Sequence, residues 1–306
     1  MVDKCRLIVI WEILRKVVSM KKITVFSVVF VSLFMFLSQV SLAKVKSESM
    51  VAVWLFDEGK ENVVADSTGN GHDGKIEKGA KWVNGRFGKA LEFDGTDDWV
   101  SIPHAKNLGF AAGKSFSITV HFKGSKVGGS LFGKGYEDKS QALPWYLLWN
   151  DGSSPKVTLF LRDEAGASFR ADGNTAIADD KWHFIAAVAD ASKGKSSIWI
   201  DGKKEAEADF NKNSGYGTND GVAAIGRHYD RYTKGIIDDV GLFSVALTAD
   251  DIKTIMDAGL GGVLTAVSTR NKLAITWGES RERKVGYHSS CFFRLVDVWR
   301  ELVQSS

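Results

Sequence analysis

The sequence predicts an all-β sandwich over residues 50–262. Short apolar or alternating runs recur through this segment, and turn sequences such as Asn-Gly, Asp-Gly and Asn-Asp-Gly separate them. Only one stretch near its end has the pattern of a helix. Because strands that are apolar on one face must cover that face against another layer, we expect a single two-layer domain.

The segment before the predicted domain has the features of an export signal. A basic pair follows Met20, an apolar run covers residues 23–37, and small residues stand at 41 and 43. This order is typical of a secretory signal peptide, and the apolar run is short for a membrane span. We therefore expect residues 1–19 to be an upstream extension and residues 20–43 to be a cleaved signal peptide. The mature protein would be secreted, periplasmic or on the cell surface, without a stable membrane anchor.

Charge and cysteine content narrow the possible partners. The chain has 40 Lys and Arg and 37 Asp and Glu residues. Six of the basic and two of the acidic residues fall within 1–43, so 34 basic and 35 acidic residues follow, a net charge of −1. Nucleic acid requires concentrated positive charge, so no nucleic-acid partner is expected. Of the two cysteines, Cys5 precedes the predicted cleavage site and Cys291 follows it alone, so no internal disulfide is expected.

Strand patterns begin soon after the predicted cleavage site. Residues 51–56 are apolar and end at an Asp-Glu-Gly turn, and residues 115–122 alternate with a period of two. The same alternation recurs in residues 156–161 and 196–200. An Asp-Gly pair at 201–202 follows the last of these runs. It predicts a tight hairpin, because both residue types accept the left-handed backbone that such turns require.

One helix is predicted at the end of the sandwich, over residues 247–259. Thr248 stands at its N-cap, acidic side chains follow in the first turn, and a glycine ends it. Residues 263–306 are expected to form a C-terminal extension. Within it, residues 272–278 have the pattern of an appended β-strand. Residues 284–306 place apolar side chains at helical spacing, so this tail either docks on the sandwich or a partner, or is not native sequence.

Several short motifs follow one another in a distinctive order. They are VWLFDEG (53–59), DSTGNGHDG (66–74), GRFGKALEFDGTDDWV (85–100), DKWHFIA (180–186), IWIDG (198–202) and GIIDDVGLFSVAL (235–247). In this succession the chain resembles the LamG-like jelly-roll domains of the concanavalin A-like lectin/glucanase superfamily, over residues 50–262. The resemblance implies a two-sheet antiparallel jelly-roll sandwich with one short C-terminal helix. It implies binding far more often than catalysis, and it does not name a ligand.

The loop at residues 66–74 raises the question of calcium. Its oxygen-bearing side chains, from Asp66 to Glu77, have the spacing of an EF-hand. The flanking segments have strand patterns instead of helical ones, and Asp73 stands where an EF-hand loop is normally apolar, so an EF-hand is not expected. The glycines and the asparagine also suit a plain surface turn.

The resemblance implies a third possibility for this loop, a structural calcium ion held where the loop meets the last strand. The expected metal ligands are Asp66, Asn70, His72, Asp238 and Asp239, with carbonyl oxygens serving at Asn70 and His72. Because side chains alternate along a strand, only one of the two adjacent aspartates is expected to point toward the loop. Calcium is thus the expected cofactor, and the plain turn stays open as the alternative.

Aromatic residues at 145–149 give the candidate ligand site. The family pattern places Tyr146 and Leu148 in the core, so Trp145 and Trp149 would line the opposite face of their strand. Aromatic faces stack well on the apolar C–H patches of sugar rings. The loop residues expected at the rim are Tyr136, Arg227 and Tyr229, with His228 beside them. We expect carbohydrate or a glycoconjugate to bind here, unless these side chains only cover the sheet or a partner module.

Three carboxylates resemble a catalytic strand. Glycosidases on this fold have a Glu-x-Asp-x-x-Glu strand, and Glu92, Asp94 and Asp97 nearly reproduce it. The last residue is Asp, however, and residues 94–97 have the pattern of a turn, so Asp97 is expected to leave the strand. No nucleophile elbow, P-loop, dinucleotide fingerprint or zinc spacing occurs.

These observations favour an exported, non-catalytic binding module for carbohydrate or a glycoconjugate. The first alternative is a structural or adhesive domain whose partner is an extracellular protein. A glycoside hydrolase is a weaker alternative, so we do not expect an enzyme.

Overall fold

The computed structural model describes residues 45–60, 62–126, 129–135, 143–149 and 154–282, with the backbone alone after residue 266. The predicted upstream extension, the predicted signal peptide, Tyr136 and the tail at 284–306 lie outside this part of the chain. Among the described residues, no helix combines the length and the apolar character that a membrane crossing needs.

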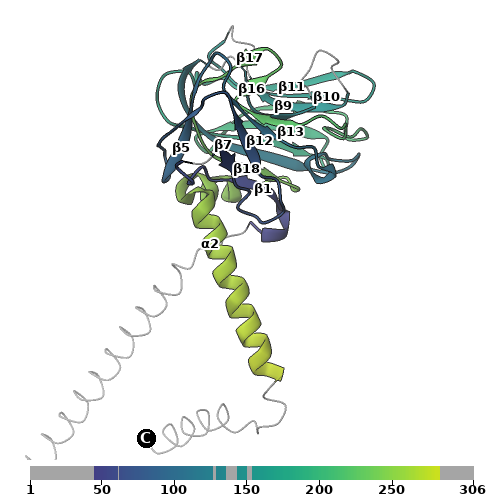
Figure 1. Cartoon of the computed structure of the whole chain (residues 1–306). Coiled ribbons are helices and arrows are strands. Elements are labelled where there is room, and N and C mark those ends of the chain that lie inside the picture. Colours follow the sequence, from purple (N-terminus) through teal and green to yellow (C-terminus); the bar gives the residue numbers. More distant parts are fainter. Residues whose placement is uncertain (1–44, 61, 127–128, 136–142, 150–153, 283–306) are drawn as a thin grey trace, which may run out of the picture. The chain divides into compact units, whose positions relative to one another are not determined.

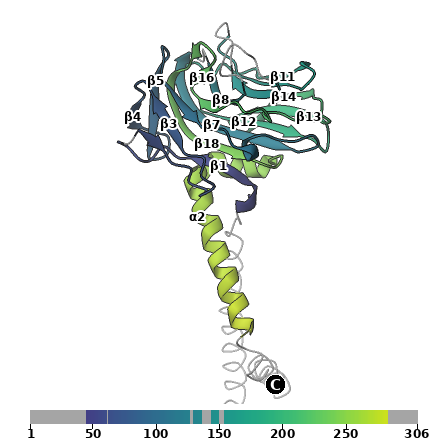
Figure 2. The ribbon, with the colours of Figure 1, turned by 45° about the vertical axis from the view of Figure 1, so that its right-hand side comes forward.

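The strands form two eight-stranded antiparallel sheets, seen as two layers in Figures 1 and 2. Sheet 1 contains, in spatial order, β14 (Lys203–Asp209), β13 (Lys195–Ile200), β12 (His183–Asp190), β7 (Phe116–Lys126), β18 (Lys234–Phe243), β5 (Lys89–Asp94) and β4 (Lys81–Asn84), with β1 (Met50–Trp54) also paired to β18. Sheet 2 contains β11 (Ser168–Asp172), β10 (Thr158–Arg162), β9 (Trp145–Trp149), β8 (Ser130–Lys134), β15 (Ala223–Ile225), β6 (Trp99–Ile102), β3 (Gly74–Glu77) and β2 (Val63–Val64). The predicted antiparallel two-sheet sandwich is therefore confirmed.

Smaller elements complete the fold. They are the 3-10 helices η1 (Ser47–Ser49) and η2 (Lys106–Leu108), the hairpin of β16 (Arg227–His228) and β17 (Arg231–Tyr232), and the helix α2 (Ala249–Glu282). In Figures 1 and 2 the β16–β17 hairpin lies at the opposite end of the sandwich from the start of α2.

The core between the sheets is built from the side chains that point inward at every second position of each strand. Phe116, Ile118, Val120 and Phe122 of β7 are all buried in it, and they meet side chains of sheet 2 such as Tyr146. Full burial of each such side chain stabilises the fold by roughly 1.5–3 kcal/mol. The predicted hairpin also forms: Asp201 and Gly202 join β13 to β14 with φ of 50° and 79°.

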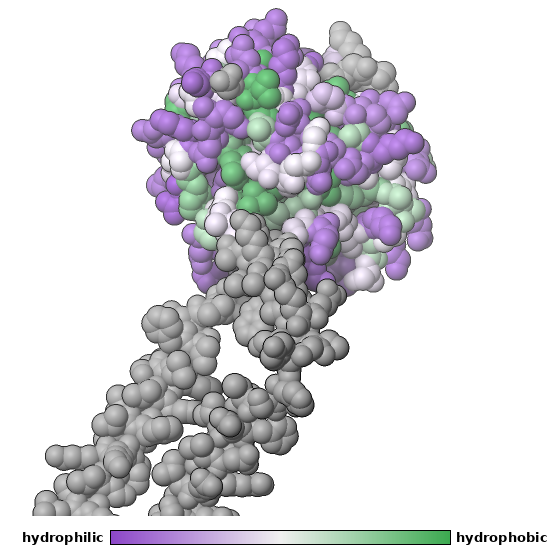
Figure 3. Space-filling model, turned by 60° about the horizontal axis from the view of Figure 1, so that its bottom comes forward, coloured by the Kyte–Doolittle hydropathy of each residue, from purple (hydrophilic) through white to green (hydrophobic). Residues whose placement is uncertain are grey.

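Helix α2 covers part of the outer face of sheet 1. Its N-terminus is capped by Thr248, as predicted. The Thr248 hydroxyl accepts a hydrogen bond from the N–H of Asp251, and the Asp251 carboxylate accepts one from the N–H of Thr248. Ile252 and Ile255 then pack in a second apolar cluster that includes Phe184 of β12. Figure 3 views the molecule from the side of α2 and shows apolar side chains among hydrophilic ones.

The C-terminal part differs from the expected β-segment. Gly259 has non-helical angles (φ 68°, ψ 165°), so the first helix ends where it was predicted to end. The backbone then resumes a helix that continues to Glu282, and residues 272–278 are helical. The prediction of a strand there is wrong, because an alternating pattern favours a strand only where a sheet edge accepts it, and no strand of the described residues pairs with this segment.

Candidate functional site

The carboxylate of Asp66, which is buried, organises the loop between β2 and β3. Its Oδ1 accepts hydrogen bonds from the N–H of Val53 (3.1 Å) and from the N–H (3.0 Å) and hydroxyl (2.7 Å) of Thr68. Its Oδ2 accepts a hydrogen bond from the N–H of His72 (3.2 Å). Four donors thus satisfy this carboxylate, and the loop closes as a turn between two strands, not as an EF-hand between helices.

Asn70 and His72 fasten the same loop to β1. The side-chain amide of Asn70 donates to the carbonyl oxygens of Met50 (3.1 Å) and Val51 (2.9 Å). The carbonyl oxygen of His72, an expected calcium ligand, accepts a hydrogen bond from the indole of Trp54 (2.8 Å). Both residues therefore have a structural function within the fold.

Asp238 and Asp239 lie where β18 bulges. Ile237 and Val240 both face the core, so the two aspartates between them both point to the outer face of sheet 1. The expected alternation of these two side chains is wrong here, because a β-bulge places one extra residue in the strand. The backbone of Asp239 has a φ of 47°, in the left-handed region.

Each of these two carboxylates has its own backbone donors. Oδ2 of Asp238 accepts hydrogen bonds from the N–H groups of Arg86 (2.7 Å) and Phe87 (2.9 Å), and Oδ2 of Asp239 accepts one from Leu260 (2.7 Å). Burial raises the pKa of Asp238 to about 7, although its backbone donors act in the opposite direction. Burial also raises the pKa of Asp239 to about 7, and the negative charge of Asp238 adds to this effect.

The expected calcium ligands thus fall into two groups on opposite edges of β1. Trp54 of β1 pairs with Val240 of β18 on one side and forms a bridge with Asp66 on the other. Asp66 is already satisfied by four donors, and the two later aspartates are held by other backbone segments. These residues do not fit one calcium site that joins the early loop to the last strand.

A pocket of ≈ 370 Å³, here called the aromatic pocket, lies on the outer face of sheet 2. It is lined by Trp145, Trp149, Phe160, Arg162, His228, Tyr229, Asp230 and Arg231. Strand β9 supplies the two tryptophans, strand β10 supplies the phenylalanine and the first arginine, and the β16–β17 hairpin supplies the rest. The structure therefore brings together three of the five residues predicted for the ligand site.

The tryptophans face outward as predicted. Tyr146 and Leu148 lie in the core, whereas Trp145 and Trp149 form a separate cluster with Phe160. Phe160 meets Trp145 edge-on at 4.8 Å between centroids and stacks on Trp149 at 5.8 Å. Trp145 is only 2% exposed and Trp149 only 7%, so the indole rings form the floor of the pocket and little of either is open to solvent.

Polar groups surround this aromatic floor. The guanidinium of Arg162 lies 6.0 Å from the ring centre of Trp145, and that of Arg231 lies 5.6 Å from the ring centre of Trp149. The indole nitrogen of Trp149 is buried and has no acceptor within the described part of the chain. Burial, and then the charge of Arg231, lower the pKa of His228 to about 3, so this imidazole is neutral at pH 7.

Arg227 supports the hairpin instead of lining the pocket. Its Nε donates a hydrogen bond to the carbonyl oxygen of Tyr229 (2.7 Å), and its guanidinium lies 4.4 Å from the ring centre of Trp99 and 5.9 Å from that of Tyr232. This arrangement fixes the turn that presents Tyr229 to the pocket. Of the remaining predicted ligand residues, Tyr136 is outside the described residues.

Four of the described pocket residues were not predicted from the sequence. They are Phe160, Arg162, Asp230 and Arg231. A signal existed for Phe160, because it alternates with Leu159 and Leu161 and must face away from the core that they fill. No such pattern pointed to Asp230 and Arg231, which reach the pocket only through the tertiary fold.

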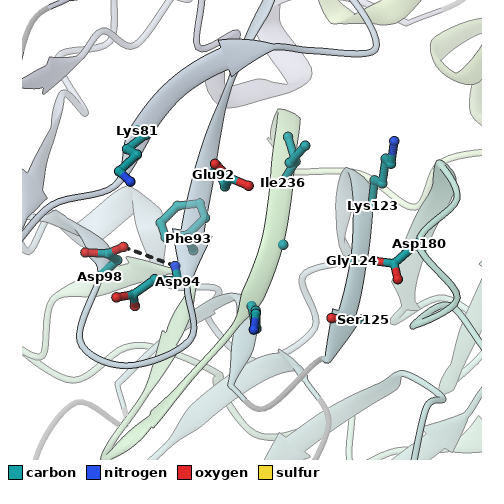
Figure 4. Close-up of a pocket in the computed structure, with 12 residues that line it drawn as sticks. Lys81, Glu92, Phe93, Asp94, Asp98, Lys123, Gly124, Ser125, Asp180 and Ile236 are labelled. Atoms are coloured by element: carbon teal, nitrogen blue, oxygen red, sulfur yellow. Dashed lines mark hydrogen bonds between the residues drawn. The ribbon is translucent and has the colours of Figure 1, made fainter.

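A second and larger hollow, ≈ 560 Å³, lies on the outer face of sheet 1. Figure 4 shows Ile236 at its centre, with Glu92, Asp94 and Lys81 on one side and Lys123 and Asp180 on the other. We call it the charged groove, because both positive lysines and negative carboxylates line it.

Strand β5 ends at Asp94, so Asp97 lies in the following turn, as expected, and does not line the charged groove. Asp98 is buried beside it, and its Oδ2 accepts a hydrogen bond from the N–H of Asp94 (3.1 Å). Burial raises the pKa of Asp98. Asp94, Asp97 and Asp98 bring carboxylate oxygens within 4.8 Å of one another, but such acidic groups are common without a metal.

Residues 94–253 match the family model of the concanavalin A-like lectin/glucanases superfamily. Comparison with curated protein sequences gave no match.

Solved structures show similar folds. The chain is similar to domain 4 of an extracellular GH43 arabinanase from Geobacillus stearothermophilus in complex with arabinotriose, at 19% identity and a TM-score of 0.54, covering 68% of this chain and 98% of that one. It is also similar to the binding domain of Paraclostridial Mosquitocidal Protein 1, at 13% identity and a TM-score of 0.54, covering 69% of this chain and 52% of that one. The receptor binding domain of botulinum neurotoxin D gives 14% identity and a TM-score of 0.52, covering 69% and 53%. This chain thus spans about half the length of the two toxin domains, and at these identities the likeness concerns the fold alone.

Proposed function

The chain belongs to the concanavalin A-like lectin/glucanases superfamily, and from this premise we propose that it is an exported, non-catalytic module that binds carbohydrate or a glycoconjugate in the aromatic pocket. The domain of the arabinanase, which has a similar fold, was solved with arabinotriose, and this supports a saccharide ligand. The predicted signal peptide supports export, and an exported domain would meet extracellular glycans.

The main support for this proposal is the size and lining of the aromatic pocket. Its volume of ≈ 370 Å³ falls within the roughly 300–1,000 Å³ of small-ligand sites. Phe160, which is partly exposed, supplies aromatic carbon for the C–H face of a sugar ring, and Trp145 and Trp149 support it from the floor of the pocket. Tyr229 and Asp230 add polar groups at the hairpin side, where sugar hydroxyls would find hydrogen-bond partners.

A glycan array with the purified protein tests the proposal, followed by calorimetry on the glycans that bind. Trp149→Ala removes the part of the floor that contacts Phe160, His228 and Arg231, so we expect at least a tenfold loss of affinity. Trp199→Ala is the matched control, because Trp199 packs with the apolar cluster on the outer face of sheet 1, and it should leave affinity unchanged.

The same measurements separate the alternatives. A protein that folds normally but binds no glycan contradicts the proposal and favours the adhesive alternative with a protein partner. Equal losses from Trp149→Ala and Trp199→Ala would place binding outside the aromatic pocket. Thermal melts of both variants show whether a loss of affinity reflects the pocket or the fold.

A further inference from the structure

We propose that the aromatic pocket selects a saccharide with an acidic group, a carboxylate or a sulfate ester, and that Arg162 and Arg231 recognise that group. This inference deepens the proposed function and rests on it. It concerns the class of ligand, which neither the fold nor the family determines.

Arg162 reaches the pocket from β10. It stands opposite Trp145 in the antiparallel pairing of β9 and β10, and its guanidinium lies over that indole. Its Nε donates a hydrogen bond to the carbonyl oxygen of Gly166 (3.1 Å), which holds the side chain in place. Within the described ranges no carboxylate lies within ion-pair distance of it, so its positive charge is not compensated.

Arg231 reaches the same pocket from β17. Its guanidinium lies over Trp149, and among the residues that the structure describes it too has no ion pair. Because Phe160 contacts both tryptophans, the two guanidinium groups flank one continuous aromatic floor. A guanidinium offers a planar set of donors that matches a carboxylate or sulfate group.

Arg170 shows what a compensated arginine looks like on the same face. Its guanidinium lies 5.4 Å from the ring centre of Phe160, but its Nε and a terminal nitrogen both donate to Oδ1 of Asp172, at 3.3 and 3.0 Å. It does not line the pocket. The contrast singles out Arg162 and Arg231 as the cations that remain available for a ligand.

Within the described residues the lining groups have a positive balance. Asp230 is the one carboxylate among the eight lining residues that the structure describes, against two arginines, and His228 is neutral at pH 7 because burial lowers its pKa. Asp230 can accept hydrogen bonds from sugar hydroxyls.

The test is an array that pairs neutral oligosaccharides of galactose, glucose and N-acetylglucosamine with their uronate and sulfate-ester forms. We expect acidic members to bind at least tenfold more tightly than their neutral counterparts at low salt. Their advantage should fall as ionic strength rises, because salt screens the attraction between charges. The uronate and sulfate members show which anion the pocket prefers.

Arginine variants assign the effect to these two side chains. Arg162→Gln and Arg231→Gln keep polar side chains but remove the charge, and each should weaken binding of the best acidic glycan by about tenfold, since a hydrogen bond to a charged group is worth that much. For each variant the loss of affinity for the neutral counterpart should be several-fold smaller than the loss for the acidic glycan, because a neutral sugar has no charge for the missing guanidinium to pair with. Arg170→Gln is the matched control and should leave both affinities within about twofold, because its charge is already paired.

The outcomes separate this inference from the proposed function. Neutral glycans that bind as well as acidic ones, with no effect of either arginine variant, overturn the inference and leave the proposed function standing. Absence of binding to every glycan overturns both. A preference for acidic glycans that Arg162→Gln and Arg170→Gln reduce equally also overturns the inference, because it would reflect general surface charge.

Discussion

The backbone N–H of Leu260 donates a hydrogen bond of 2.7 Å to Oδ2 of Asp239. This contact joins the second segment of α2 to the bulge of β18, next to the left-handed Gly259 that interrupts the helix. A carboxylate that accepts from the first N–H groups of a helix acts as a cap. The bulge and the helix kink therefore depend on each other.

Replacement of Gly259 tests this junction. In Gly259→Ala the new Cβ would lie 2.8 Å from Oδ2 of Asp239 and 2.9 Å from the ring of Phe87, at a φ of 68° that alanine rarely adopts. We expect a loss of about 1–3 kcal/mol in the free energy of unfolding, measured by urea denaturation.

Gly261→Ala is the control for that variant. The nearest atom to its new Cβ is 3.6 Å away, so it should be neutral or stabilise the helix by up to about 1 kcal/mol. If the two variants were equally stable, Gly259 would not set the junction.

The raised pKa values of Asp238 and Asp239 predict a pH dependence. Both groups have a pKa of about 7 in the folded protein, against 3.8 as the reference value. Between pH 3.8 and 7 the two aspartates keep their protons in the folded state but have lost them in the unfolded state. The stability that these two groups contribute therefore falls as the pH rises from about 4 to about 7. Buried His121, whose pKa burial lowers to about 4, acts in the opposite direction over pH 4 to 6.5.

A comparison of Asp238→Asn with the unchanged protein isolates the aspartate contribution. Asparagine can still accept the hydrogen bonds from Arg86 and Phe87, but it does not ionise. The variant should therefore gain stability relative to the parent by roughly 1 kcal/mol per pH unit between pH 5 and 7. Parallel stability curves for the two proteins would contradict the raised pKa.

Chelation is expected to have no effect on thermal stability. The Asp66 carboxylate is satisfied by donors of the chain, and the residues expected to bind calcium do not form one site. We expect the same Tm with and without EDTA. Asp66→Ala should lower stability by about 2–4 kcal/mol in both conditions, because it leaves several buried donors without an acceptor. A Tm that EDTA lowers in the parent but not in Asp66→Ala would restore the calcium hypothesis.

Arg227 is predicted to affect glycan affinity indirectly, because it holds the β16–β17 hairpin that presents Tyr229 to the pocket. Arg227→Lys keeps the charge but loses the planar contact with Trp99 and the hydrogen bond to the carbonyl oxygen of Tyr229. Stability should fall by about 1 kcal/mol, and glycan affinity should fall with it because Tyr229 is less well positioned. Arg231→Lys, at an exposed position, should change stability by less than about 0.5 kcal/mol. Urea melts and calorimetry on the same samples check both effects.

Hydrolysis of β-glucan is not expected. Catalysis by a retaining glycosidase needs two carboxylates about 5–5.5 Å apart across the scissile bond. Strand β5 ends at Asp94, which leaves Glu92 on the strand and Asp97 in the turn. No reducing ends should appear in a colorimetric assay, with either the parent or Glu92→Gln. Activity in the parent that Glu92→Gln abolishes would make the charged groove an active site.

The sequence by itself determined the properties that depend on neighbouring residues. Once the family pattern had placed Tyr146 and Leu148 in the core, alternation with a period of two identified Trp145 and Trp149 as facing away from it. Asp-Gly at 201–202 determined a hairpin, and Thr248 determined the start of a helix, since both depend on local backbone chemistry. The same local reasoning failed for residues 272–278, which are helical, because an alternating pattern forms a strand only beside another strand.

Tertiary structure alone decided how distant residues combine. Only the register of β9 with β10 places Arg162 opposite Trp145, and only the β16–β17 hairpin brings Arg231 to Trp149. The bulge in β18 turned Asp238 and Asp239 to the same face, which a strict period of two excludes. Strand register, bulges and hairpin placement follow from packing across the whole domain, so spacing along the chain does not reveal them.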